Sequence, residues 1–327
     1  MTPSFDAKMK SLKDMVVERM FQAVPSENPV TLYEPIRYAI ASGGKRLRPV
    51  LLLLVCEATG GRPEDALDAA VALELVHNFT LVHDDIMDND DLRRGKETVH
   101  KKWDRNVAIL SGDALLVLAY SMLHRRSHNR LAQVLDDFSR GILQVCEGQT
   151  LDKEFESRKD VTLAEYFDMI DKKTAELFSV ACHVGSVLGG GTAEQMAAMR
   201  IYGKKLGRAF QIQDDLLDVI AEENVLGKDI GSDLEANKKT FLVVHALQHS
   251  DDRQKKQLQA ILHKGKVTTD DVRAVIDLFK QTKTLDAARL EVDTCLQDAK
   301  KALLPLPDNS ARLQLGELID LVAGRNS

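Results

Sequence analysis

The chain has 327 residues, of which 44% are hydrophobic and 29% charged, ample for a large core beneath a soluble surface. Forty-four basic residues against fifty acidic ones give a net charge of −6, which argues against general binding to nucleic acid or to an anionic membrane. The most apolar run, residues 49–56, is far shorter than the ~18 residues of a membrane span. Four scattered cysteines without a CxxC pair, and a charged N-terminus without a signal-peptide core, predict a cytoplasmic protein.

The distribution of proline and glycine predicts the fold class. All eight prolines lie at residues 3–63 or at 305 and 307, so residues 64–304 can form one long helix after another. Residues 63–88 and 192–220 repeat apolar residues at three- and four-residue steps, which predicts two long buried helices. Glycines at 43–44, 60–61 and 189–191 mark turns, and no flexible linker divides the chain. We expect a single all-α domain over residues 1–327.

Each of these two predicted helices carries a DDxxD cluster. The clusters are Asp84, Asp85 and Asp88 in the first helix, and Asp214, Asp215 and Asp218 in the second. Residues i and i+4 share a helix face, and like charges at that spacing destabilise a helix by about 0.2–0.5 kcal/mol per pair. Magnesium binds such carboxylates together with substrate phosphates. One cluster alone is typical of a solvated helix end, whereas two in apolar helices favour a magnesium-dependent diphosphate site.

Basic residues follow both clusters and one glycine pair. They are Lys45 and Arg48 after the glycines, Arg93 and Arg94 after the first cluster, and Lys228 and Lys238 after the second. Guanidinium and ammonium groups bind diphosphates, although each of these residues taken alone could be a solvated loop charge. His77 lies seven residues before Asp84, hence on the same helix face. This shared face favours a role for His77 in binding a ligand over that of an ordinary core histidine.

From about residue 37 to 245 the chain resembles the trans-isoprenyl diphosphate synthases, the polyprenyl synthetase family. The resemblance rests on a series of motifs in order: GGKRLRP, LVHDDIMDNDDLRRG, EGQTLD, KKTAELF, FQIQDDLLD and GKDIGSDLEANKKT. It implies a helical bundle of the isoprenoid synthase type with a central apolar cavity. It also implies a homodimeric enzyme that joins isopentenyl diphosphate to an allylic diphosphate with magnesium.

The resemblance also implies a role for each candidate residue. Magnesium, expected as three ions, would be held by Asp84, Asp85, Asp88, Asp214, Asp215 and Asp218. The allylic diphosphate would be bound by Arg93, Lys173, Lys228 and Lys238, and isopentenyl diphosphate by Lys45, Arg48, His77 and Arg94. Gln211, which would also bind substrate, and Thr174 match positions near the reacting carbons. The catalytic set is thus Asp84, Asp85, Asp88, Lys173, Thr174, Gln211 and Asp214.

In this family, product length depends on the residues four and five positions before the first cluster, here Thr80 and Phe79. Five residues along a helix correspond to about 7.5 Å, so an aromatic ring there can form the floor of the cavity. A single aromatic residue favours geranylgeranyl diphosphate as the product, with farnesyl diphosphate as the nearest competitor and a longer polyprenyl diphosphate as a further alternative. The other reading is that Phe79 only packs against a neighbouring helix.

Two other classes of protein share parts of this pattern. A class I terpene cyclase has the first cluster, but normally replaces the second and does not need GGKRLRP. A regulatory subunit of a heteromeric synthase typically loses one aspartate cluster or the basic site. Both clusters and the basic residues are intact here, so the synthase is favoured.

Overall fold

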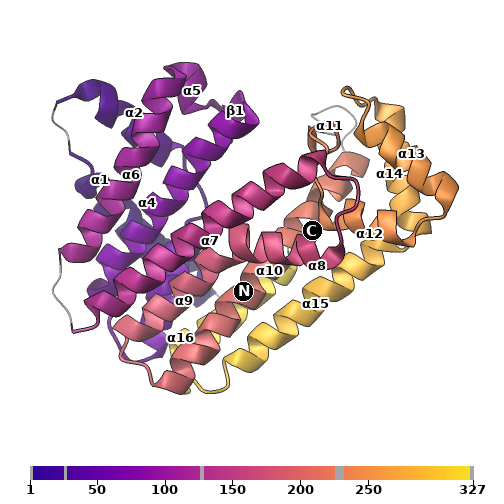
Figure 1. Ribbon diagram of the computed structural model, residues 1–327. Helices are drawn as coiled ribbons and strands as arrows, with labels where there is room; N and C mark the ends of the chain where they lie inside the picture. The colour runs from indigo at the N-terminus through magenta and orange to yellow at the C-terminus, as the bar shows by residue number, and fades with distance from the viewer. Residues whose placement is uncertain (1–2, 26–27, 126–128, 225–231, 325–327) are drawn as a thin grey trace. The chain divides into compact units, whose positions relative to one another are not determined.

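The computed structural model describes residues 3–25, 28–125, 129–224 and 232–324, and within these ranges the only strands form one short hairpin (Figure 1). The predicted all-α class is therefore confirmed. In chain order the elements are α1 (Pro3–Ala23), α2 (Val30–Ala41), α3 (Leu47–Ala58), α4 (Pro63–Asp88), β1 (Leu92–Arg93), β2 (Lys96–Glu97), α5 (Val99–Lys102), α6 (Arg105–His124), α7 (Leu131–Ser157), α8 (Leu163–Ile170), the π-helical segment η1 (Asp171–Ala175), α9 (Glu176–Leu188), α10 (Ala193–Asn224), α11 (Ser232–Glu235), α12 (Phe241–His249), α13 (Asp252–Leu262), α14 (Thr269–Gln281), α15 (Thr284–Ala302) and α16 (Ser310–Ala323).

The chain folds into two compact units, each assembled from segments that are distant in sequence. Unit 1 consists of Met1–Ile142, Val180–Arg200 and Pro305–Glu317. Unit 2 consists of Leu143–Ser179, Ile201–Leu304 and Leu318–Ser327. Four of the five boundaries fall within α7, α9, α10 and α16, and the fifth, at residues 304–305, lies between α15 and α16. That residues 1–327 act as one functional domain stays a prediction.

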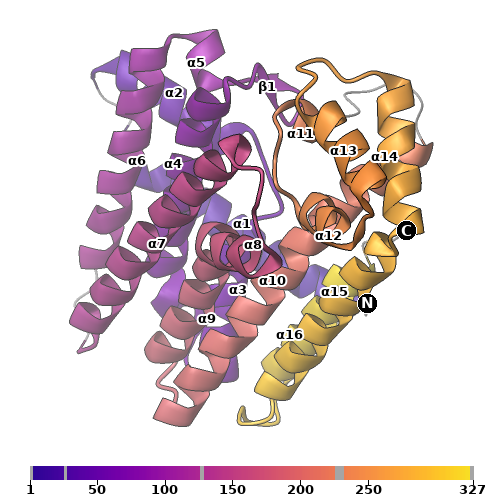
Figure 2. The same ribbon diagram turned by 45° about the vertical axis from the view of Figure 1, so that its right-hand side comes forward.

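Helix α4 lies at the centre of unit 1, where it packs against α1, α3 and α6 (Figure 2). It begins at Pro63, whose fixed φ suits the first helical turn. It ends at Asp88 because Asn89 adopts the left-handed conformation with φ 55°, which asparagine tolerates better than most residues. The first aspartate cluster therefore occupies the last turn of α4. Carboxylates there oppose the helix dipole, an arrangement that helix stability does not favour.

Helix α3 accounts for the most apolar run of the sequence. Each residue from Val50 to Cys56 is completely buried within unit 1. A helix that is apolar on all sides belongs in a protein core. Among the described residues, only α6 has the length and composition of a membrane span, and it packs along α4 with 39% of its most apolar stretch buried.

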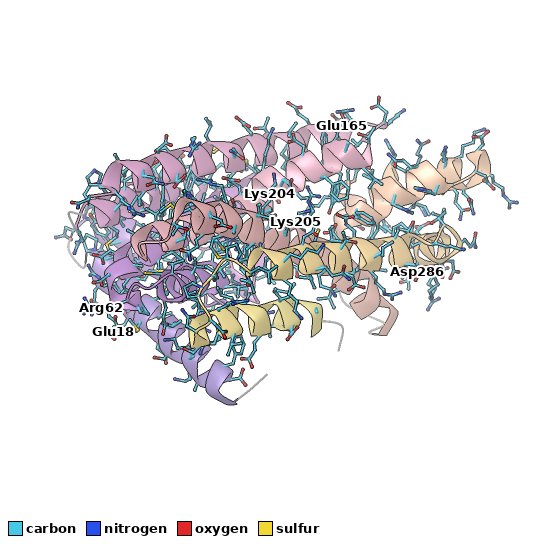
Figure 3. All side chains as sticks on the ribbon, turned by 90° about the horizontal axis from the view of Figure 1, so that it is seen from below. Glu18, Arg62, Glu165, Lys204, Lys205 and Asp286 are labelled. Carbon is cyan, nitrogen blue, oxygen red and sulfur yellow. The ribbon has the colours of Figure 1, made fainter. Side chains whose placement is uncertain are left out.

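In unit 2, α8 runs directly into η1, and both helices α8 and α15 pack against α12. The segment η1 is held in place by Arg208 of α10, which forms two hydrogen bonds with Asp171 at 2.9 and 2.6 Å. Lys204 adds an ion pair with Asp171 at 3.1 Å. The neighbouring Lys205, labelled beside Lys204 in Figure 3, pairs instead with Asp298 of α15 at 3.0 Å.

Candidate active site

The first aspartate cluster includes a buried carboxylate. Asp85 is 4% exposed and accepts a hydrogen bond from Nε of Arg93, while Nη2 of Arg93 also contacts Asp90 at 3.2 Å. Burial raises the pKa of Asp85 to about 6, and the opposing effect of Arg93 only partly offsets this. Asp84 and Asp88 are half-buried beside it. The last turn of α4 thus presents closely spaced carboxylates with one arginine already bound to them.

The hairpin β1–β2 brings two arginines back to the end of α4. Arg93 pairs with Lys96 across the hairpin, and the intervening Arg94 and Gly95 both have positive φ, at 53° and 75°. Positive φ at both central residues is what a tight two-residue hairpin turn of the I′ type requires. From this turn the Arg94 side chain donates a hydrogen bond to the carbonyl of Gly43, in the GGKRLRP segment.

The predicted isopentenyl diphosphate residues of unit 1 lie around this hairpin. Nη1 of Arg48 is 3.4 Å from Nε2 of His77. The pKa of His77 lies well below its usual range, chiefly because of burial and then because Arg48 and Arg94 face it. His77 is therefore neutral at physiological pH and can donate a hydrogen bond without adding charge. Lys45 is exposed, as a residue that meets a ligand from solution would be.

A small cavity opens beside the same residues in unit 1. Its lining includes Tyr38, Ser42, Asn78, Asp85, Arg93 and Arg94. The cavity lies against α4 and the hairpin, so Asp85 and both arginines border one small space, which Leu81, Val82 and Val99 line as well.

In the second cluster, in unit 2, one carboxylate accepts several hydrogen bonds from the protein itself. Asp215 is buried and accepts hydrogen bonds from Tyr166 Oη at 2.9 Å, from the backbone N–H of Phe241 at 3.1 Å and from Gln211 Nε2 at 3.0 Å. Asp214 is half-buried and Asp218 exposed. Asp215 thus joins α8, α10 and α12, while Asp214 and Asp218 are more accessible to a ligand.

Gln211, Thr174 and Asp215 form a chain of hydrogen bonds. The Thr174 hydroxyl donates to Gln211 Oε1 at 2.9 Å, and the amide nitrogen of Gln211 donates to Asp215. Thr174 lies in the π-helical segment, a conformation that occurs often at functional sites. The structure therefore places both residues predicted near the reacting carbons beside the second cluster.

Lys173 shares the π-helical segment and pairs with Asp152 of α7 at 2.5 Å. The close approach of α7 depends on Gly148, where an added Cβ would lie 2.3 Å from the backbone nitrogen of Lys173. This contact brings the EGQTLD and KKTAELF segments side by side. Lys238 is half-buried just before α12. Lys228 lies outside the described residues.

Sequence reasoning missed four residues that support these sites. Tyr166 holds Asp215, Glu74 pairs with buried Arg46 at 2.6 Å, and Lys239 is buried with its ammonium group on the side-chain oxygen of Asn237 at 2.7 Å. Burial lowers the pKa of Lys239 to about 8. For Arg46 and Lys239, the available signal was a charged residue within the motifs GGKRLRP and GKDIGSDLEANKKT. No local pattern distinguishes Tyr166 from an ordinary core tyrosine.

The side chains fit magnesium by donor chemistry. Both clusters offer the carboxylate oxygens that this ion prefers, on helix ends or accessible helix faces, beside cations that can hold the phosphates it would share. Within the described ranges, no three carboxylate, histidine or cysteine side chains are already gathered around one point as a metal site. Asp84, Asp88, Asp214 and Asp218 are the carboxylates that would hold the ion most directly.

Fold and sequence comparisons define the class of protein. The chain belongs to the polyprenyl synthetase family, whose model matches residues 29–279. It is 38% identical to a geranylgeranyl diphosphate synthase of Methanosarcina mazei over 97% of both chains. Its structure resembles that of a geranylgeranyl pyrophosphate synthetase from Pyrococcus horikoshii, with a TM-score of 0.92, 40% identity and 98% of both chains covered. A decaprenyl diphosphate synthase from Rhodobacter capsulatus gives the same TM-score at 31% identity over 99% of both chains. The family membership predicted from the motifs is thus confirmed.

Proposed function

We propose that this protein is a magnesium-dependent prenyltransferase that condenses isopentenyl diphosphate with an allylic diphosphate to give geranylgeranyl diphosphate. The observation that carries the proposal is the junction of the first aspartate cluster with the Arg93–Arg94 hairpin and the GGKRLRP segment in unit 1. The names of the geranylgeranyl diphosphate synthases among its relatives support it. We further infer that both clusters serve one reaction and that residues 1–327 act as a single domain.

In this mechanism the allylic diphosphate is held by Arg93, Lys173, Lys228 and Lys238, and isopentenyl diphosphate by Lys45, Arg48, His77 and Arg94. Bound magnesium, held by the two aspartate clusters and most directly by Asp84, Asp88, Asp214 and Asp218, would supply electrophilic assistance to departure of the diphosphate. The allylic C–O bond breaks with its electron pair leaving on diphosphate, and the alkene of isopentenyl diphosphate forms the new C–C bond. The released diphosphate then accepts the proton that is lost.

The protein residues supply electrostatic preorganisation. Arg93 and Lys173 are each already held by a carboxylate, Asp85 and Asp152, so their charges are oriented before substrate arrives. We infer that the hydrogen-bonded Thr174 and Gln211 turn their oxygen dipoles toward the developing cation. Ordered dipoles of this kind stabilise a cation without offering a nucleophile that would trap it.

Product length is assigned to Phe79 and Thr80 of α4. The hydroxyl of Thr80 donates to the carbonyl of His77 at 2.8 Å, so the small side chain is satisfied within the helix. Phe79 is then the bulky residue at the proposed floor. The shared fold of a decaprenyl diphosphate synthase supports assigning product length to side chains rather than to the backbone. Farnesyl or longer products remain the alternatives, ahead of a terpene cyclase or a regulatory subunit.

We further propose that the protein is a homodimer in the cytoplasm. Ile109, Leu110 and Val117 of α6 are 39%, 58% and 66% exposed, and such an apolar row on a helix is typical of a protein–protein contact. We infer that α6 contributes to the contact with a second copy. No binding to nucleic acid is proposed, in keeping with the net charge of −6.

The test is a product assay with purified protein, magnesium and isopentenyl diphosphate. Dimethylallyl, geranyl and farnesyl diphosphate are each offered as primer, and products are sized by chromatography. Mainly geranylgeranyl diphosphate is expected. Longer products would contradict the role of Phe79 while retaining the reaction, and no elongation with any primer would contradict the proposed function.

A further inference from the structure

The turn that carries Lys45 has an unusual backbone. Gly43, Gly44 and Arg46 all have positive φ, at 82°, 132° and 52°. Glycine adopts this region readily, but for arginine it is unfavourable, so other contacts must hold Arg46 there. Gly44 is also tightly packed, because an added Cβ would lie 2.6 Å from Nη1 of Arg94.

The side chain of Arg46 supplies those contacts from inside unit 1. It is 2% exposed, and its Nη1 donates to Oε1 of Glu74 at 2.6 Å. Its Nη2 donates to the carbonyl of Ile40, at the end of α2, at 2.5 Å. The side chain of Glu74 is only 3% exposed and lies on α4, one turn before Asn78. The guanidinium therefore ties the turn to two helices, and a buried charge pair of this kind tolerates little displacement.

The neighbours of Arg46 face other surroundings. Lys45 is exposed, and Arg48 is half-buried against His77. Because Arg46 points into the protein, the preceding lysine is turned outward. Arg94 closes the same turn by donating to the carbonyl of Gly43. The ion pair thus anchors the turn that carries Lys45, leads into Arg48 and accepts the hydrogen bond from Arg94.

We propose that Arg46, through its buried ion pair with Glu74, is a positioning residue that sets Lys45, Arg48 and Arg94 for binding isopentenyl diphosphate. This inference rests on the proposed function, which assigns those three cations to that substrate. Arg46 is enclosed by protein and acts only through the turn, so its loss should weaken binding of one substrate and spare the other.

The test compares KM for isopentenyl diphosphate with KM for farnesyl diphosphate in Glu74→Gln and in the double variant Arg46→Met, Glu74→Leu. The double variant replaces the ion pair by apolar side chains of similar size, a change that buried pairs often tolerate without loss of stability. We expect both to raise KM for isopentenyl diphosphate about tenfold or more, the effect of one misplaced charged hydrogen bond. Arg46→Lys, which keeps the charge but loses the fork that bonds both Glu74 and the carbonyl of Ile40, should give a smaller rise.

Asp68→Asn is the matched control. Asp68 also lies on α4 and pairs with an arginine, Arg19, at 2.8 Å, but this pair does not touch the turn. A rise in KM for isopentenyl diphosphate no larger than in Asp68→Asn, or an equal rise for both substrates, would overturn the positioning role. Lys45→Ala and Arg48→Ala distinguish a wrong substrate assignment from a wrong role for Arg46. If neither raises that KM, the assigned substrate is wrong; if both do and the ion-pair variants do not, only the role of Arg46 is wrong.

Discussion

The imidazole of His83 supports the ring of Phe79 one turn earlier on α4, with the two rings edge to face and their centroids 4.9 Å apart. His83 is itself seated on α6, where its Nε2 lies 3.1 Å from the carbonyl of Ile109. Gly112 leaves the necessary space, since a Cβ there would lie 2.2 Å from that nitrogen. The proposed floor of the cavity is therefore fixed by contacts between two helices of unit 1.

Removal of the Phe79 ring should lengthen the product. In Phe79→Ala the floor loses its bulk, and the growing chain can pass about one helical turn further before it meets a side chain. The measurement is the size distribution of products from farnesyl diphosphate and excess isopentenyl diphosphate. An unchanged distribution would mean that Phe79 only packs against its neighbours.

Crowding His83 should shift product length without touching Phe79. Gly112→Ala forces the imidazole away from α6, so we expect longer products together with a loss of stability of about 1–3 kcal/mol from overpacking. Gly316→Ala on α16 is the control, because an added Cβ there meets nothing within 4 Å. Stability loss with unaltered products would leave His83 a packing residue only.

Loss of either leading aspartate should abolish most turnover while the fold survives. Asp84→Ala and Asp214→Ala each remove a proposed magnesium ligand, so we expect kcat to fall by at least about 100-fold. Circular dichroism checks the fold. Asp286→Asn, at an exposed position of α15 that Figure 3 labels, should retain activity. Near-normal activity in both cluster variants would contradict the metal assignment.

The Tyr166 hydroxyl should matter for stability more than a surface hydroxyl does. Tyr166→Phe removes a buried donor from Asp215, which we expect to lower the free energy of unfolding by about 1–3 kcal/mol. Tyr120→Phe, which breaks a hydrogen bond with Ser139 at the surface, should change it by less than about 0.5 kcal/mol. Urea unfolding of both variants provides the comparison, and equal losses would refute the special role of the buried bond.

Buried Lys239 should make stability rise at alkaline pH. Its pKa is lowered to about 8 in the folded protein, against 10.5 for an exposed lysine. Between these values the unfolded chain binds more protons than the folded one, so the free energy of unfolding increases with pH. The wild-type protein should therefore gain stability relative to Lys239→Met between pH 8 and about 10.5. A constant difference between the two proteins across this range would contradict the buried, readily deprotonated state.

Local sequence determined the helices and the chemical character of the site. Helical periodicity and the absence of proline from residues 64–304 depend only on near neighbours, as does the shared face of Asp84 and Asp88. The same holds for the cations placed after each cluster. These features, taken in order along the chain, were sufficient to predict the family.

Tertiary structure alone decided how the site residues are supported. Arg46 and Glu74 are 28 positions apart, and Tyr166 and Asp215 are 49 apart, so no periodic pattern could pair them. Burial, which separates Asp85 from its neighbour Asp84 and Lys239 from Lys238, likewise depends on which helices pack against a residue. Hydrogen bonds and desolvation act through space, and it is the packing of distant segments that gives otherwise similar aspartates and lysines their different roles.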